Sequence, residues 1–505
     1  MHSQALISIG LYFVLMLAIG VYAYRKSTSD VSEFMLGGRQ LPPAVAALSA
    51  GASDMSGWML MGLPGAVYLS GMGAAWIAVG LIVGAFLNYL LVAPRLRVYT
   101  EIANDAITIP DFFEKRFQDH SHLLRTISAL IIVIFFTLYT SAGIVAGGKL
   151  FEASFGIDYT TGLFITAVAV LAYTLFGGFL AVSLTDFVQG CIMFLALVLV
   201  PIVTFWVLGG WSPVATQIHA IKPDFMNWFQ GLTVLGLISS LAWGLGYFGQ
   251  PHIIVRFMAI RTLKDVATAR NIGMAWMIVT VVGAVLVGIA GLAFVTRTQA
   301  VLNDPETIFI LLSQVLFHPL VAGFLLAAIL AAIMSTISSQ LLVSSSSLTE
   351  DFYKYFVRRG ASQKELVLVG RLSVLLVSVV AICLAFDRSS SILSLVSNAW
   401  AGFGAAFGPI ILLSLYWRRL TRNGALAGLL VGAVTVLCWL YLPVTIHGQS
   451  LSSTLYEIVP GFVLSFIAAV GVSLMDKAPE AGIGTTFDAM ARIIKTNGPI
   501  KVEAE

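Results

Sequence analysis

A single carboxylate, Asp54, stands in the middle of a long apolar stretch, within the segment Ser-Ala-Gly-Ala-Ser-Asp-Met-Ser-Gly at residues 49–57. A charge at such a depth costs about 2.5–3.5 kcal/mol in a membrane, so this carboxylate needs a partner. Gly51 and Gly57 weaken a helix and let the backbone approach a ligand closely. Interrupted backbone exposes carbonyl oxygens, which together with a carboxylate suit a cation. The segment predicts an ion and substrate site; the alternative is that Asp54 only caps a helix that resumes after a kink.

A second apolar stretch is interrupted at residues 241–251, where Gly244, Gly246, Gly249 and Pro251 weaken the helix. Paired interruptions of this kind are typical of transporter sites that are built on inverted repeats. Gly and Pro are also common in membrane helices for packing reasons, so the interruptions alone leave both interpretations open.

A run of hydroxyls in a third apolar stretch places Ala332, Ser335 and Thr336 at positions i, i+3 and i+4. Such a face can offer one carbonyl and two side-chain oxygens to a common point, which is half of a sodium shell. The alternative is that these hydroxyls donate to the carbonyl four residues earlier or pack helices together.

The composition is that of a polytopic membrane protein. Hydrophobic residues make up 58% of the 505 positions and charged residues only 10%, and the mean hydropathy is +0.93. The net charge of +3 implies no nucleic-acid partner, because the basic residues gather where membrane topology requires them. Cys191, Cys383 and Cys438 fall in apolar stretches without metal-ligand spacing, so neither a disulfide nor a metal cluster is expected.

Thirteen apolar runs are each near the length that crosses a bilayer. All but four of the 28 Lys and Arg residues fall on one side if the N-terminus is outside and the C-terminus inside; the exceptions are Lys149, Lys222, Arg297 and Arg388. The expected spans are residues 5–24, 43–70, 73–94, 126–148, 159–178, 187–208, 230–250, 273–296, 319–348, 368–386, 391–416, 424–442 and 457–475.

The acidic residues indicate which ion is used. Asp54 is the only acid expected deep in a span; Asp186 is the most inward of those at span ends, and all seven His are expected in connections or near span ends. Proton relays and acid–base or nucleophilic enzymes need several such groups at depth, so sodium is favoured over protons and a membrane enzyme is disfavoured. Residues 476–505 are too few for a kinase domain, which argues against a transporter-like sensor.

Several segments together closely resemble the sodium/solute symporter family over nearly the whole chain. The stretch around Asp54 and the one at 243–252 resemble the proline branch of that family. The segments that carry the resemblance are residues 36–39, 47–58, 62–65, 177–181, 243–252 and 422–428.

The resemblance implies an all-α fold like the core of the bacterial leucine transporter, formed by residues 1–505 as one transmembrane domain. Five helices at 41–208 form the first repeat and five at 230–417 an inverted second repeat. One helix at 5–24 precedes the repeats, two helices at 424–475 follow them, and residues 476–505 form a cytoplasmic tail.

The resemblance also implies roles for individual residues. Sodium would bind the carbonyls of Ala52, Met55 and Ala332 and the hydroxyls of Ser335 and Thr336, with Asp54 as the compensating charge. Arg39 and Asp186 are assigned to gating and coupling. The proline pocket would involve Ser56, Gly57, Trp58, Tyr139, Trp243, Tyr247 and Pro251.

These inferences predict import of one L-proline with one sodium ion by alternating access, in the plasma (inner) membrane of a bacterium, without a cofactor. The alternative is another small solute on the same scaffold, such as a different amino acid, pantothenate or a sugar. The sequence gives no oligomeric state.

Overall fold

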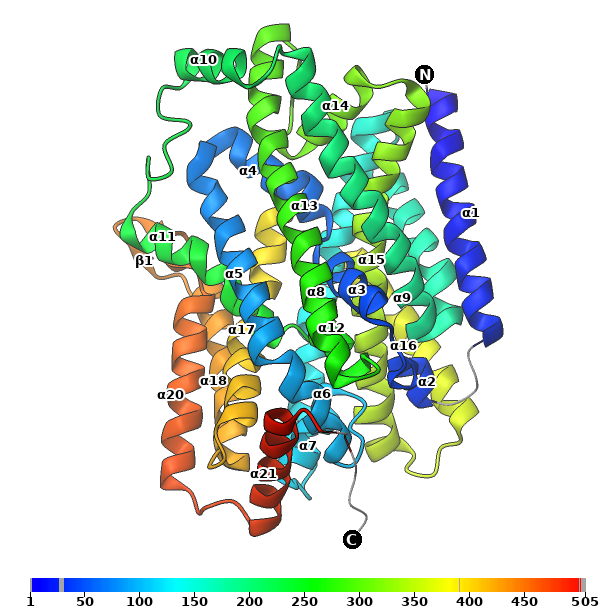
Figure 1. Cartoon of the computed structure of the whole chain (residues 1–505), viewed down its shortest axis with the longest axis vertical. Coiled ribbons are helices and arrows are strands. Elements are labelled where there is room, and N and C mark those ends of the chain that lie inside the picture. Colours follow the sequence, from blue (N-terminus) through cyan, green and yellow to red (C-terminus); the bar gives the residue numbers. More distant parts are fainter. Residues whose placement is uncertain (1, 27–30, 390, 499, 501–505) are drawn as a thin grey trace.

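The computed structural model describes residues 2–26, 31–389, 391–498 and 500, and these form one bundle of long, roughly upright helices (Figure 1). The expected all-α architecture is confirmed, with one small antiparallel hairpin of β1 (Thr445–Ile446) and β2 (Gln449–Ser450). The N-terminus lies at the upper end in Figure 1 and the C-terminus at the lower end. Residues 499 and 501–505 of the expected tail lie outside the described residues.

The first half of the chain contains two interrupted or kinked membrane segments among continuous helices. Its elements are α1 (His2–Lys26), α2 (Val31–Leu36), η1 (Gly37–Arg39), α3 (Pro43–Asp54), η2 (Trp58–Gly62), α4 (Leu63–Ser70), η3 (Gly71–Ala74), α5 (Ala75–Leu91), α6 (Ala93–Ile102), α7 (Ile109–Phe117), α8 (Leu123–Phe155), α9 (Tyr159–Val207) and α10 (Trp211–Ile221).

The second half begins with another interrupted segment and ends with a short amphipathic helix. Its elements are α11 (Val234–Leu241), η4 (Ala242–Gly249), α12 (Pro251–Ala259), α13 (Leu263–Thr298), η5 (Pro305–Thr307), α14 (Ile308–Leu316), α15 (Pro319–Ser346), η6 (Ser347–Val357), α16 (Gln363–Leu384), α17 (Ile392–Tyr416), α18 (Arg422–Tyr441), α19 (Leu451–Thr454), α20 (Ile458–Met475) and α21 (Ala481–Thr496).

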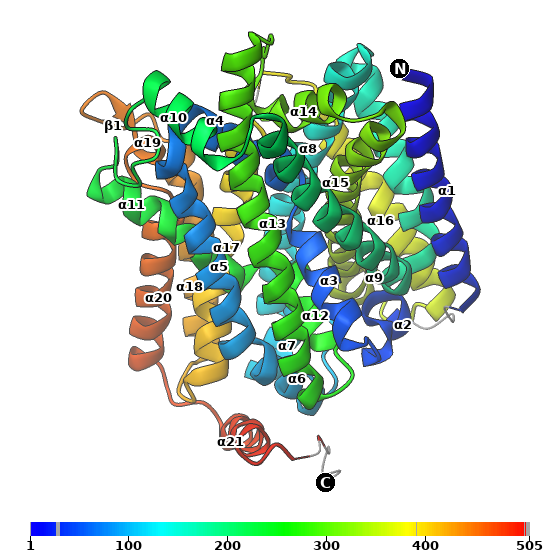
Figure 2. The ribbon, with the colours of Figure 1, turned by 45° about the horizontal axis from the view of Figure 1, so that its top comes forward.

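Ten helices of the described chain are long and apolar enough to cross a membrane, and three shorter apolar helices accompany them. In both views, α1 lies along one edge of the bundle and α18 and α20 along the other (Figures 1 and 2). The interrupted helix α3 lies between these edges and packs against α9, α12, α13 and α15.

The expected interruption near Asp54 is present. Helix α3 ends at Asp54, Met55 leaves the helical region with φ −84° and ψ 83°, and a π-helical turn begins at Trp58. Gly51 is required for a different reason, because a Cβ atom there would lie 2.7 Å from the Trp276 ring of α13. The small residues of this segment therefore have two roles: they allow the helix to be interrupted, and they allow neighbouring helices to pack closely.

The second interruption is also confirmed. Helix α11 gives way to the 3₁₀ segment η4, Gln250 adopts an extended conformation, and Pro251 starts α12 at the position where proline is tolerated. The backbone of η4 lies directly against α5: a Cβ atom on Gly84 would lie 2.3 Å from the Gly244 carbonyl, and one on Gly244 would lie 2.2 Å from the Gly80 carbonyl.

One expected boundary is wrong. The predicted connection over residues 179–186 is helical, because the two helical parts of α9 meet directly at a kink at Gly178, which has φ 58° and ψ −155°. A Cβ atom on Gly178 would lie 2.9 Å from the Phe34 carbonyl, so only glycine fits. The membrane segment therefore begins at Gly178, and Asp186 lies inside it, fully buried, rather than at its end.

Candidate functional site

The two interrupted helices meet at Asp54. The Tyr247 hydroxyl on η4 donates a hydrogen bond to the Asp54 carboxylate at the end of α3. The Asp54 carbonyl accepts from the Trp58 indole at 3.1 Å and from the Tyr139 hydroxyl of α8 at 3.5 Å. Asp54 is 2% exposed, so these contacts lie in the interior of the bundle. Four predicted site residues from three membrane segments are thus brought together.

The break in α3 frees two backbone carbonyls. The Ser56 amide donates to the Asp54 carbonyl at 3.0 Å instead of to Ala52, and the Met59 amide donates to the Ser56 carbonyl at 3.0 Å instead of to Met55. The carbonyls of Ala52 and Met55 therefore lack the amides that a continuous helix would give them. These are two of the three carbonyls that were predicted to bind sodium; the third is that of Ala332.

The hydroxyls of α15 converge on one of the freed carbonyls. Ser335 Oγ donates to the Ala52 carbonyl at 2.6 Å and lies 3.1 Å from the Ala332 carbonyl. Thr336 Oγ1 lies 3.4 Å from the Ala52 carbonyl and 3.1 Å from the Ala332 carbonyl. Each of the two hydroxyls is therefore within hydrogen-bond distance of both carbonyls, so four of the five predicted sodium ligands lie together at the contact between α3 and α15.

The Asp54 carboxylate faces a different side of α3. Its protein partner is Tyr247, and it lines a small cavity with residues of α5, α12 and α13. The hydrogen bonds that Ser335 and Thr336 make within the described chain go to the carbonyls of Ala52 and Ala332 and not to this carboxylate. The residues predicted to bind sodium therefore lie on two sides of the broken helix: the Asp54 carboxylate on one side, and the oxygens shared with α15 on the other.

The aromatic residues of η4 pack on a tryptophan that the sequence analysis did not single out, Trp400 of α17. The Tyr247 ring lies 5.0 Å from the Trp400 ring in an edge-to-face arrangement, and the Trp400 indole donates to the Trp243 carbonyl at 2.7 Å. Trp243 itself lies against Tyr456, with ring centroids 5.3 Å apart. In the sequence, Trp400 could have been noticed because it is the first residue of a Gly-rich apolar stretch at residues 400–408.

The remaining predicted pocket residues are buried around the same breaks. Ser56 is buried, and a Cβ atom on Gly57 would lie 2.9 Å from Ala146 of α8, so Gly57 permits close contact between the break and α8. Pro251 is buried at the first position of α12. The next residue, His252, is fully buried at the edge of the Tyr139 ring, which corrects the expectation that every His lies near a span end.

Asp186 belongs to a buried polar cluster that joins four membrane segments. Its carboxylate pairs with Arg256 of α12 at 3.2 Å and accepts from Ser49 of α3 at 2.7 Å. Arg256 also donates to Ser49 at 3.0 Å and to Ser339 of α15 at 2.7 Å. Arg256 and Asp186 are both fully buried. The sequence analysis missed this ion pair because it placed Asp186 at a span end and Arg256 in the connection between the expected spans 230–250 and 273–296.

Breaking that ion pair is expected to destabilise the protein. Arg256→Gln leaves the Asp186 charge buried without a partner, which costs about 3–5 kcal/mol. The matched control is Arg358→Gln, which removes a pair with Glu365 from a side chain that is 64% exposed and costs less than about 1 kcal/mol. The measurement is the melting temperature of the purified variants in detergent. The double variant Asp186→Asn/Arg256→Gln should recover most of the loss, and failure to recover would assign the effect to packing.

Arg39 lies at the lower end of the bundle, buried between the start of α3 and two neighbouring segments. Its guanidinium pairs with Asp105 at 2.8 Å, donates to Thr100 at 3.1 Å and reaches the carbonyls of Met258 at 2.9 Å and Ala106 at 2.6 Å. Arg39 therefore connects the segment that enters α3 with α6 and with the end of α12.

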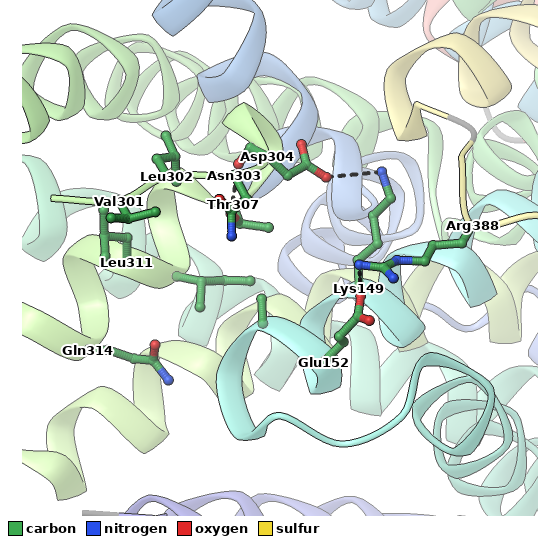
Figure 3. Close-up of a pocket in the computed structure, with 12 residues that line it drawn as sticks. Lys149, Glu152, Val301, Leu302, Asn303, Asp304, Thr307, Leu311, Gln314 and Arg388 are labelled. Carbon is green, nitrogen blue, oxygen red and sulfur yellow. Dashed lines mark hydrogen bonds and ion pairs between the residues drawn. The ribbon is translucent and has the colours of Figure 1, made fainter.

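A charged cluster lies at the upper end of the bundle beside a cavity of about 410 Å³ (Figure 3). Lys149 of α8 pairs with Asp304 and with Glu306, both at 3.2 Å, and Arg388 pairs with Glu152 at 3.0 Å. The Glu306 carboxylate also accepts from backbone amides at the start of α17. The cluster therefore ties the segment before α14 to α8 and α17.

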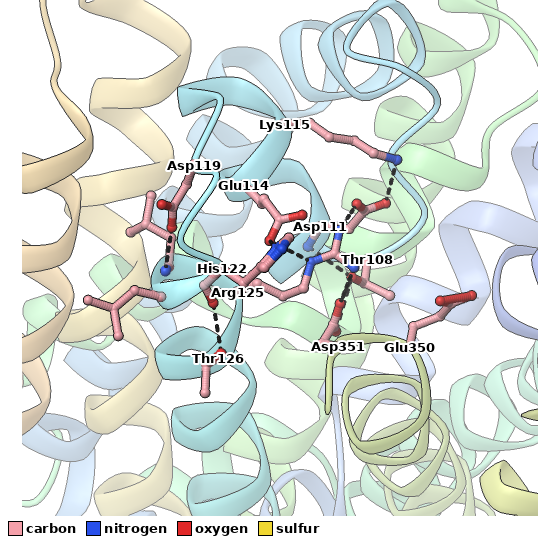
Figure 4. Close-up of polar contacts among 12 residues, drawn as sticks. Thr108, Asp111, Glu114, Lys115, Asp119, His122, Arg125, Thr126, Glu350 and Asp351 are labelled. Carbon is pink, nitrogen blue, oxygen red and sulfur yellow. Dashed lines mark hydrogen bonds and ion pairs between the residues drawn. The ribbon is translucent and has the colours of Figure 1, made fainter. Parts of the chain in front are cut away.

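A second charged cluster lies at the lower end (Figure 4). Arg125 of α8 pairs with Asp111 of α7, with Glu114 at 3.1 Å and with Asp351 of η6 at 3.6 Å. Thr108, which caps α7, also donates to Asp351 at 3.0 Å. Because α7, α8 and η6 share these contacts, the lower end of α15 is fixed to α8.

A bundle of apolar helices in which two interrupted members meet at one buried carboxylate has the architecture of a secondary transporter. The chain belongs to the sodium:solute symporter family, whose model matches residues 34–432. It is therefore a multi-pass membrane transporter and not an enzyme.

Similar proteins cover nearly the whole chain. An osmoregulated proline transporter, OpuE, of Bacillus subtilis is 59% identical over 495 residues, which are 98% of this chain and 99% of that protein. The high-affinity proline transporter PutP of the same organism is 58% identical over 94% of this chain and 98% of its own length. A sodium/proline symporter of Staphylococcus aureus is 55% identical over 97% of this chain and 96% of its own length.

Two solved structures share the fold. A Na⁺-coupled sialic acid symporter in a substrate-bound outward-open state superposes with a TM-score of 0.78 at 19% identity, over 94% of this chain and 99% of that chain. MHP1, a nucleobase-cation-symport-1 family transporter in a closed conformation, superposes with a TM-score of 0.56 at 13% identity, over 93% of this chain and 96% of that chain. The expected fold of the leucine-transporter type is thereby confirmed.

Proposed function

We propose that this protein imports L-proline together with sodium across the bacterial plasma membrane. The observation that carries the proposal is the identity of 55–59%, over nearly the full length, with proteins that are named as proline transporters or sodium/proline symporters. The meeting of two interrupted helices at Asp54 supplies the kind of site that such transport requires.

Sodium binds, in this proposal, between α3 and α15. The carbonyls of Ala52, Met55 and Ala332 and the hydroxyls of Ser335 and Thr336 supply five oxygens, which suits a hard monovalent cation. The freed carbonyls and the short distances across the contact between α3 and α15 support this ligand set. Proline and sodium are the transported ligands, and no cofactor takes part.

Proline binds beside the breaks, where its charged groups meet polar backbone and its ring meets aromatic surface. The pocket is formed by Ser56, Gly57, Trp58, Tyr139, Trp243, Tyr247 and Pro251. Trp400 joins this set because it contacts both Tyr247 and Trp243. A closed pyrrolidine ring loses little conformational freedom on binding, so a tight pocket can prefer it to flexible amino acids of similar size.

Coupling follows from the position of the sodium ligands on two helices. Sodium that binds Ala52 and Ser335 together holds the broken helix α3 against α15, and this fixes the conformation in which the pocket residues after the break meet proline. Each ligand then raises the affinity for the other by the same factor. Arg39, which precedes α3, bonds to α12, and Asp186 of α9 bonds to Ser49 of α3. During alternating access these contacts must either move together with α3 or break.

The proposed topology has thirteen membrane segments, with the N-terminus outside and the C-terminus inside. The interrupted segments α3–α4 and α11–α12 each cross the membrane once. Helix α9 accounts for two crossings, one before and one after its kink at Gly178. Residues 41–208 and 230–417 form the inverted repeats. Lys149 and Arg388 lie in the upper cluster of Figure 3, and the basic residues of Figure 4 lie in the lower one, which supports a cytoplasmic lower end.

Proline uptake by the purified protein in proteoliposomes is expected to be electrogenic. One sodium ion that enters at about 100 mV contributes about 2.3 kcal/mol, which is enough for roughly 50-fold accumulation of a neutral zwitterion. Uptake should collapse with a sodium ionophore and survive a proton uncoupler when the sodium gradient is clamped. Sodium-dependent uptake of pantothenate or a sugar in a radiolabelled panel, without proline uptake, would keep the family and reject the substrate.

A further inference from the structure

A cavity of about 460 Å³ lies at the lower end of the bundle, where α6 packs against α12, α13 and α21 (Figures 1 and 2). It is formed by α6, by the connection from α12 to α13 and by residues that follow α21. Its volume is within the range of small-molecule pockets. The polar residues of its lining are Arg97, Glu101, Arg261, Thr262, Lys264 and Asn497.

Basic side chains outnumber acidic ones in this cavity. Arg97, Arg261 and Lys264 carry three positive charges, and Glu101 is the one acid of the described lining. Glu101 pairs with Arg97, which lies four residues earlier on α6. The lining therefore keeps an excess of positive charge, which attracts an anionic ligand.

Two of the basic side chains have groups that remain available to a ligand. The Lys264 ammonium has no ion-pair or hydrogen-bond partner within the described chain. Arg261 pairs through Nε with Asp265 at 2.7 Å, and its two Nη atoms have no partner among the described residues. Arg97, in contrast, donates to the carbonyls of Ile260 and Arg261 and so holds the connection against α6.

The chemistry of these two side chains favours a phosphate group as the ligand. Guanidinium groups bind phosphate oxygens in pairs, and lysine binds phosphate as a point charge. A phosphate group carries enough oxygens to contact Arg261 and Lys264 together. The lower end is cytoplasmic in the proposed topology, and basic pockets between membrane helices on that side are typical sites for the headgroups of anionic lipids.

We propose that this cavity is a phosphate-binding site, in which Arg261 and Lys264 bind the phosphate group of an anionic lipid headgroup or a free phosphate ion. The site is separate from the residues proposed above to bind sodium and proline.

The site is placed to restrain both interrupted helices. The Arg261 amide donates to the Leu41 carbonyl at 3.2 Å, and the Leu41 amide donates to the Ala259 carbonyl at 3.0 Å. Leu41 lies just before α3, and Ala259 is the last residue of α12. A ligand that holds Arg261 beside the start of α13 therefore also stabilises the contact between the lower ends of α3 and α12.

Lipid binding by the purified, full-length protein tests the proposal without transport. The protein is delipidated in detergent and titrated with phosphatidylglycerol or with phosphatidylcholine, and bound lipid is measured per chain after re-isolation. Phosphatidylglycerol should bind more tightly and should raise the melting temperature. Arg261→Gln and Lys264→Gln should each weaken its binding about fivefold, and the double variant about 25-fold, because each basic residue near a membrane surface contributes about that factor.

Lys364→Gln is the matched control. Lys364, like Lys264, is exposed and is the second residue of a membrane helix that begins at the cytoplasmic end in the proposed topology, but it lies outside the cavity. Its substitution should leave binding unchanged, and Lys264→Arg should retain binding because the charge is kept. Equal melting temperatures in the absence of lipid would show that the variants are folded.

A parallel titration with inorganic phosphate identifies the source of the ligand. Phosphatidylglycerol binding that depends on Arg261 and Lys264 assigns the cavity to a lipid headgroup. Phosphate binding with the same dependence, together with equal binding of the two lipids, assigns it to free phosphate. The proposal is overturned if neither ligand binds, if the double variant binds as well as the unaltered protein, or if Lys364→Gln causes an equal loss.

Discussion

Asp54→Asn is expected to abolish proline uptake. The substitution keeps the size of the side chain and an oxygen that can accept from Tyr247, but it removes the negative charge at the meeting point of the two interrupted helices. Although the carboxylate faces another side of α3, its charge compensates the sodium ion bound between α3 and α15, so its loss lowers the sodium affinity. Without sodium the broken helix is not held in the conformation that binds proline. Initial rates of radiolabelled proline uptake at fixed sodium gradient measure the effect.

The control for this variant is Asp387→Asn, which removes an exposed acid from the connection between α16 and α17 and should leave uptake unchanged. The amount of Asp54→Asn protein in the membrane should not fall, because loss of a buried charge lowers the cost of insertion by about 2.5–3.5 kcal/mol. Near-normal uptake with unchanged sodium dependence would show that Asp54 is only a helix cap.

The second large effect is expected at the contact between α3 and α15. Ser335→Ala and Thr336→Ala each remove one oxygen from the cluster around the Ala52 carbonyl. Each variant should raise the sodium concentration for half-maximal uptake by about tenfold or more, because a ligand to a charged group contributes about 1.5–3 kcal/mol. The maximal rate at saturating sodium should change less, and lithium, the smaller ion, is the second cation to compare.

Ser344→Ala and Ser346→Ala are matched controls on the same helix. Both side chains are buried, but Ser344 Oγ has no protein partner in the described chain, and Ser346 Oγ donates back to the Leu342 carbonyl at 2.9 Å. Neither hydroxyl takes part in the cluster around Ala52. Equal small effects at all four positions would show that the hydroxyls of α15 pack helices and do not bind the ion.

The positions of both breaks could be predicted from the sequence. The residues that weaken a helix, such as Gly57 and Pro251, are read directly from the chain, and one acid in an apolar run needs no structure to be recognised. The pairing of Tyr247 with Asp54 follows once the two breaks are placed together, because an interrupted helix is stable in a membrane only where it is buried against protein.

The polar interior beyond Asp54 could not be predicted in the same way. Asp186 and Arg256 are 70 positions apart in the sequence, and each alone looks like the end of a span, since a charge interrupts an apolar run. Only the kink at Gly178 and the packing of α12 against α3 bring them together in the interior.

The contact between α5 and η4 restricts how the transporter can move. At Gly80, Gly84 and Gly244 the two backbones touch without side chains between them, so sliding one segment along the other would force carbonyls into contact. Side chains elsewhere can change rotamer to absorb such a shift, but a backbone cannot. The upper half of the second broken helix must therefore travel with α5 as one rigid body, and the bending needed for alternating access falls at Gln250, the extended residue where η4 ends and α12 begins.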